Sequence, residues 1–136
     1  DFKMDRKSFE QLVTEGVDAI PGKFLQKMKN VRIVVEDYPS PEQREKLKLR
    51  GDTLLLGLYE GVPQPARGWG YTMVLPDKIT IFQQSIEQLS SNPADIKKQV
   101  KETVWHEIAH HFGLNEKGVR EATKRQRPEA GKKALN

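Results

Sequence analysis

The sequence predicts a single α+β domain, on three observations. The chain has 136 residues, which is the usual size of one domain. Residues 5–20 repeat apolar residues with the period of an amphipathic helix, and a helix-start signal at residues 90–93 opens a second helix that runs to about Phe112. Two other segments, residues 31–38 and 53–59, are runs of the β-branched and apolar residues typical of buried strands. The chain contains no cysteine, which excludes a disulfide framework, a cysteine-ligated zinc site and a cysteine nucleophile.

The first half of the chain is expected to form two helices, a strand and a short helical segment. Asp5 is a candidate N-cap for the helix over residues 5–20. Pro21-Gly22 ends this helix and can open a second, short one that runs through Lys29. A strand is predicted over residues 31–38, after which the prolines at 39 and 41 break the extended chain. Residues 42–49 can then form one or two helical turns.

The second half is expected to alternate short strands with helices. A strand over residues 53–59 leads into a Gly- and Pro-rich loop that reaches Gly70. Short strands are predicted at 71–75 and 78–82, on either side of a turn at Pro76-Asp77, and a helix follows at 83–89. Three residues mark the start of the last helix: Asn92 as N-cap, Pro93 at the first helical position and Asp95 in the first turn. This helix should run to about Phe112 and end at Gly113.

A metal-binding motif lies at the end of that last helix. All three histidines fall between positions 106 and 111, and they include the pattern H-E-x-x-H. On a helix, His106 and His110 are about 40° apart and one turn apart, so their imidazoles can bind one zinc ion. Glu107 lies near the same face, where a general base can reach water beside the metal. These residues therefore predict metal binding.

A catalytic zinc site usually has three protein ligands and leaves a fourth position to water. Gly113 can adopt the left-handed conformation that ends a helix and reverses the chain. Three residues beyond it, Glu116 can return to face His106 and His110. Glu116 is therefore the candidate third ligand.

The sequence resembles the zincin metallopeptidases, and in particular a family of small, single-domain, zincin-like bacterial proteins. The resemblance spans roughly residues 8–122 and is carried by EDYPSPEQ (36–43), GLYEGVP (57–63), LPDKITIF (75–82) and HEIAHHFGLNE (106–116). The spacing to Glu116 is similar to that of the metzincin branch, although no Met follows Met73, so the Met-containing turn of that branch is absent. In the thermolysin-like branch the third ligand is a Glu further along the chain, and on that pattern Glu121 is the alternative to Glu116.

The resemblance implies a minimal zincin-like fold, in which a small mixed sheet packs on the active-site helix and the metal lies in a shallow cleft beside an edge strand. It also implies hydrolysis of peptide bonds by water activated on Zn²⁺, held by His106, His110 and Glu116, with Glu107 as the general base. An extended peptide or unfolded protein would be the substrate, paired with the edge strand at 53–59. The alternative is a catalytically silent module that binds a metal or a peptide.

The positive charge is concentrated in the last twenty residues. Residues 117–136 contain seven Lys or Arg and two Glu, so their net charge is +5, whereas the whole chain carries +4. We expect the domain to cover residues 1–124 and a basic, flexible tail to cover 125–136. Such a tail could contact an acidic partner or nucleic acid, but it lacks the interleaved aromatic residues of base-stacking segments, so nucleic acid is the less favoured partner. The sequence shows neither a membrane-spanning segment nor a signal peptide, which predicts a cytoplasmic protein without membrane contact.

Two further side chains have alternative interpretations. His111 falls outside the stripe that His106 and His110 share, and we expect it to be buried and hydrogen-bonded to a carbonyl rather than to bind metal. Tyr59 could donate to an oxyanion, but a solvent-facing hydroxyl on a strand is the favoured interpretation. The stripe formed by Trp105, Ile108 and Phe112 should pack in the core.

Overall fold

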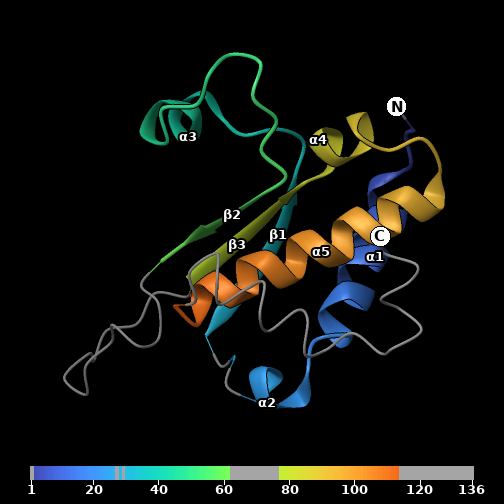
Figure 1. Ribbon diagram of the computed structural model, residues 1–136, viewed down its shortest axis with the longest axis vertical. Helices are drawn as coiled ribbons and strands as arrows, with labels where there is room; N and C mark the ends of the chain where they lie inside the picture. The colour runs from blue at the N-terminus through green and yellow to red at the C-terminus, as the bar shows by residue number, and fades with distance from the viewer. Residues whose placement is uncertain (1, 27, 29, 62–76, 114–136) are drawn as a thin grey trace, which may run out of the picture.

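A three-stranded mixed sheet forms the layer on which the longest helix packs (Figure 1). The strands of this computed structural model are β1 (Val31–Glu36), β2 (Gly57–Glu60) and β3 (Asp77–Phe82), in the order β1-β3-β2. The central strand, β3, is parallel to β1, from Val31 opposite Asp77 to Glu36 opposite Phe82. It is antiparallel to β2, from Gly57 opposite Ile81 to Glu60 opposite Lys78. The structure describes residues 2–26, 28, 30–61 and 77–113.

Five helices surround this sheet in the described part of the chain: α1 (Arg6–Asp18), α2 (Gly22–Leu25), α3 (Pro41–Lys46), α4 (Gln83–Gln88) and α5 (Pro93–His111). The orange ribbon of α5 runs across one face of the sheet, with α1 packed against it (Figure 1). The short helices α2 and α3 lie at opposite ends of the molecule (Figure 1). The combination of helices with a small mixed sheet confirms the predicted α+β fold.

The ends of α5 are set by the residues that the sequence indicated. The side chain of Asn92 accepts a hydrogen bond of 2.9 Å from the backbone N–H of Asp95, and Pro93 opens the helix. At the other end Gly113 has a φ of 75°, which is the left-handed conformation that ends the helix. The start of α1 is also as expected, because Asp5 accepts from the N–H of Ser8. Hydrogen bonding by Ser8, chiefly from its side chain, lowers the pKa of Asp5.

The hydrophobic core lies between the sheet, α1 and α5. Its fully buried members come from all three: Phe9 of α1, Ile79 and Ile81 of β3, and Val100 and Val104 of α5. Helix α1 packs on α5 at Gly16, where an added methyl group would also fit. A Cβ placed on Gly16 would lie 3.5 Å from Cγ2 of Val104, at van der Waals distance. This packing fixes α5, and with it the candidate site, over the sheet.

Strand β2 is shorter than the run of residues 53–59 predicted, because it begins only at Gly57. Its partner β3 ends at Phe82, where α4 begins directly at Gln83. The N–H of Phe82 makes the last connection, a hydrogen bond of 2.9 Å to the carbonyl of Leu56. Residues 53–55 therefore have no partner strand among the described residues. They form an irregular segment that leads into β2.

Other boundaries also differ from expectation. Helix α2 ends at Leu25 rather than at Lys29, and β1 ends at Glu36 rather than at Tyr38. Asp77 is the first residue of β3 rather than part of a turn, since its N–H bonds to the carbonyl of Asn30 at 2.9 Å. The predicted loop from Glu60 to Gly70 is described only at its start, and the strand at 71–75 and the segment after Gly113 lie outside the described residues.

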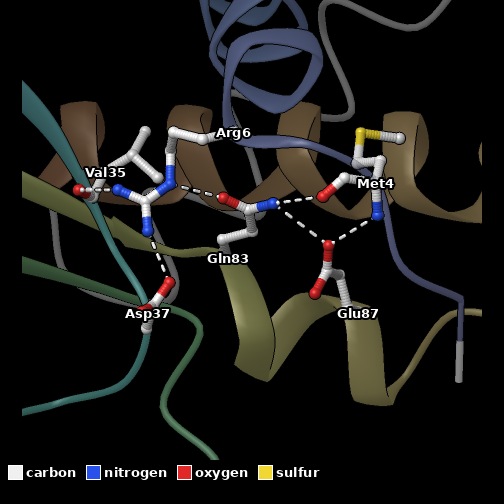
Figure 2. Close-up of polar contacts among 6 residues, drawn as sticks. All are labelled: Met4, Arg6, Val35, Asp37, Gln83 and Glu87. Atoms are coloured by element: carbon white, nitrogen blue, oxygen red, sulfur yellow. Dashed lines mark hydrogen bonds and ion pairs between the residues drawn. The ribbon is translucent and has the colours of Figure 1, made fainter.

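A polar network holds the N-terminal segment against α4 and β1 (Figure 2). The side chain of Arg6 donates to Gln83 Oε1 at 2.6 Å, to the carbonyl of Val35 at 3.1 Å and to Asp37. Gln83 in turn donates to Glu87, which also accepts from the N–H of Met4 at 2.9 Å. Glu87 is buried and its carboxylate is hydrogen-bonded. The network therefore has a structural role, since it attaches the start of α1 to α4 and to the end of β1.

Candidate metal centre

The C-terminal half of α5 presents the H-E-x-x-H residues on one side of the helix. The imidazole rings of His106 and His110 have their centroids 4.8 Å apart at an interplanar angle of 40°. Both residues are only partly buried, whereas the neighbouring Ile108 and Ala109 are fully buried. The two rings therefore lie side by side, one helical turn apart, at the boundary between the core and solvent, as two nitrogen ligands of one ion require.

Glu107, the residue after His106, has only 8% of its surface exposed. It lines a cavity of about 300 Å³ together with His106. The remaining walls come from α5 and from the end of the irregular segment that enters β2: Leu55, Leu56, Gly57, Gln99, Glu102 and Thr103. A carboxylate and an imidazole thus meet at one solvent-accessible hollow beside a strand.

Gly57 allows β2 to lie this close to the helix. A Cβ at this position would lie 2.6 Å from Cγ2 of Thr103 and 3.0 Å from Cγ of Glu107, well inside normal van der Waals separation. Any larger residue would push β2 away from α5 or displace the Glu107 side chain. The glycine in the GLYEGVP segment therefore has a direct physical role at the site.

Asp77, His111 and the partly buried Tyr59 form a polar cluster at the end of α5. His111 is fully buried and Asp77 is 1% exposed. Nδ1 of His111 lies 2.6 Å from Oδ2 of Asp77, and the hydroxyl of Tyr59 donates to the same oxygen at 2.7 Å. Since a carboxylate can only accept, His111 carries its proton on Nδ1. We call these three residues the Asp77 cluster.

The Asp77 cluster corrects two expectations. The burial of His111 is as expected, and the partner of its Nδ1 is the carboxylate of Asp77, where a carbonyl was expected. The hydroxyl of Tyr59, expected to face solvent, donates to Asp77 instead. Asp77 itself was not predicted as part of the site, because the sequence pattern assigned it to a turn. The alternation of β3 could have identified it, since Asp77, Ile79 and Ile81 occupy every second position and therefore share one face of the strand.

The opposite side of α5 is apolar, as expected. Trp105 is buried and its ring centroid lies 5.3 Å from that of Phe24 in α2. Phe24 also packs on Phe112, with centroids 5.1 Å apart. These aromatic contacts give the helix one buried side and one side that faces the cavity.

The donor set fits zinc as far as the structure describes it. Two imidazoles on one helical face are borderline-soft nitrogen ligands of the kind that zinc prefers. Glu116 and Glu121, the candidates for the third ligand, lie outside the described residues. Within residues 2–61 and 77–113, apart from the gaps at 27 and 29, no three His, Asp or Glu side chains come together as a metal site.

The fold and the H-E-x-x-H helix define a small α+β protein of zincin type. The chain belongs to the zincin-like metallopeptidase family, whose model matches residues 28–125. Among solved structures, a conserved hypothetical protein from Thermus thermophilus has a similar fold, with a TM-score of 0.54 and 23% sequence identity. The match covers 80% of this chain and 94% of that protein. No curated protein matches the sequence.

Zinc binding and peptide hydrolysis are thus the properties implied for the family as a whole. As for membranes, none of the helices that the structure describes has both the length and the apolar composition needed to cross a bilayer.

Proposed function

We propose that this protein is a zinc-dependent metallopeptidase, with His106, His110 and Glu116 as zinc ligands and Glu107 as the general base. The observation that carries the proposal is the arrangement on α5. The imidazoles of His106 and His110 lie 4.8 Å apart, and His106 lines a solvent-open cavity together with the buried Glu107. A purely structural metal site would not need a carboxylate that shares a solvent-open cavity with one of its ligands.

When bound, zinc would supply Lewis-acid chemistry, acidifying a water molecule and polarising the scissile carbonyl. His106 and His110 would hold the ion at the edge of the cavity. Glu107 would accept the proton of the attacking water at a carboxylate oxygen and return it to the leaving amine nitrogen. Because Glu107 is 8% exposed and its Cγ packs closely against Gly57, the position of the side chain is fixed before substrate binds.

Strand β2 offers a surface on which a substrate could be aligned. It pairs with β3 on one side, and on the other side the described sheet has no further strand. An extended peptide could add to this edge by main-chain hydrogen bonds, which would bring it past the cavity at Leu56 and Gly57. The substrate class that fits is a flexible peptide or an unfolded protein segment.

The test compares the wild type with Glu107→Gln, which retains the size of the side chain and removes its basicity. The variant should retain zinc but lose hydrolysis of casein by about 10²–10⁴-fold, the usual contribution of a general base. Glu45→Gln is the matched control, since Glu45 is exposed on α3, remote from the site. A wild-type protein that carries zinc yet cleaves nothing in a broad peptide library would show a silent metal- or peptide-binding module instead.

A further inference from the structure

The last turn of α5 is attached to the sheet at one buried carboxylate. On the face of the sheet toward α5, β3 presents Ile81, Ile79 and Asp77 in succession, and only Asp77 is polar. The polar position coincides with the end of the helix, where His111 is the final helical residue. A polar contact therefore replaces apolar packing at the point where α5 carries its candidate ligands.

Along this contact, two residues of strand β2 have nearly the same length as four residues of helix α5. Two strand residues span about 6.6–6.8 Å and four helical residues span about 6 Å. Gly57 accordingly lies against Thr103 and Glu107, and Tyr59, two residues on, reaches the Asp77 carboxylate that also holds His111. The rings of Tyr59 and His111 are 6.0 Å apart in an edge-on arrangement.

The chain just beyond β2 covers the carboxylate of Asp77. Gly61 has a φ of 150°, and a Cβ there would collide with the carboxylate of Asp77. The backbone at Gly61 thus covers the carboxylate, which excludes water from it. Three separate segments meet at Asp77: its own strand, the end of β2 and the end of α5.

We infer that Asp77 is a positioning residue for the metal centre, acting through His111 and with Tyr59 as the second donor. His111 directly follows the candidate ligand His110 and lies two residues before Gly113, whose positive φ marks the end of the helix. Two hydrogen bonds to one buried oxygen fix the rotation of the last helical turn, and this rotation sets where the imidazole of His110 points and how the chain leaves the helix. The inference rests on the proposed function, since it requires that His110 bind metal.

The experiment measures metal geometry rather than activity. Asp77→Asn removes the acceptor charge and Tyr59→Phe removes one donor, while each retains the shape of the side chain. Ile81→Val, at the inward position of β3 remote from the cluster, is the control for a simple loss of stability. Zinc affinity is measured by competition with a chromophoric chelator, and the coordination geometry is read from the visible absorption bands of the Co²⁺-loaded protein, both well below the unfolding temperature.

Asp77→Asn should weaken zinc binding by about tenfold or more, as loss of groups that orient metal ligands does, and should shift the cobalt bands. Tyr59→Phe should change both in the same direction by less, and it remains informative if Asp77→Asn fails to fold. Ile81→Val should leave both unchanged. If Tyr59→Phe and Asp77→Asn lower the melting temperature but match Ile81→Val in affinity and spectrum, Asp77 is only structural. A wild type that binds neither metal would instead overturn the proposed function, and this inference with it.

Discussion

Replacement of Gly57 by alanine tests the close approach of β2 to the site. The added methyl group would lie 2.6 Å from Cγ2 of Thr103 and 3.0 Å from Cγ of Glu107, whereas carbon atoms pack at about 3.5–4.0 Å. Relief of the first contact requires a shift of roughly 1 Å, which the β-branched Thr103 cannot supply by rotation alone. Overpacking of this kind costs about 1–3 kcal/mol. For a domain of this size, the melting temperature should fall by about 3–12 °C.

The same shift should displace the candidate general base. Misplacement of a catalytic group by about 1 Å can reduce the rate by about 10²-fold. The activity of Gly57→Ala at 25 °C should therefore fall by more than its loss of folded protein explains. Thermal unfolding followed by circular dichroism and casein hydrolysis at 25 °C measure the two effects. Gly51→Ala is the matched control, because a Cβ on Gly51 meets no atom within 4 Å. If Gly57→Ala melts and cleaves like Gly51→Ala, β2 does not lie against Glu107 as described.

The helix packing, the candidate ligands and the basic tail each give a further prediction. Gly16→Ala should raise stability by up to about 1 kcal/mol, because alanine favours the helix and its methyl would lie at contact distance from Val104; a fall in the urea midpoint would contradict this. Glu116→Ala should weaken zinc binding while Glu121→Ala should leave it nearly unchanged, and the reverse order would assign the third ligand to Glu121. Deletion of residues 125–136, proposed to be a basic flexible tail outside the domain, should leave the melting temperature and zinc content unchanged and reduce salt-sensitive binding to polyanions; a large fall in melting temperature would show that the tail packs on the domain.

Local signals in the sequence predicted much of the fold. The boundaries of α5 follow from Asn92, Pro93 and Gly113, whose effects on helix ends act within a few residues and need no knowledge of the rest of the chain. The length of β2 did not follow, because it is set by where the partner strand β3 turns into α4. Strand pairing is a tertiary property, and an apolar run such as residues 53–56 is compatible with either outcome.

The candidate site, like the fold, was only partly predictable from the sequence. The proximity of His106 to His110 follows from helical geometry alone. The burial of His111 was also predictable, but its link to Asp77 joins residues 34 positions apart, which only the sheet and helix packing bring together. The role of Gly57 was equally hidden, since a glycine within an apolar run does not reveal which side chain packs against it.

The zinc content of the protein, purified without added chelator, tests the central claim most directly. Elemental analysis should find about one zinc ion per chain, and dialysis against a strong chelator should remove it. His106→Ala should fail to retain zinc under the same conditions while it keeps the helical circular dichroism of the wild type. Absence of zinc from the wild type even after incubation with the metal, or full retention by His106→Ala, would contradict the assignment of α5 as the metal-binding helix.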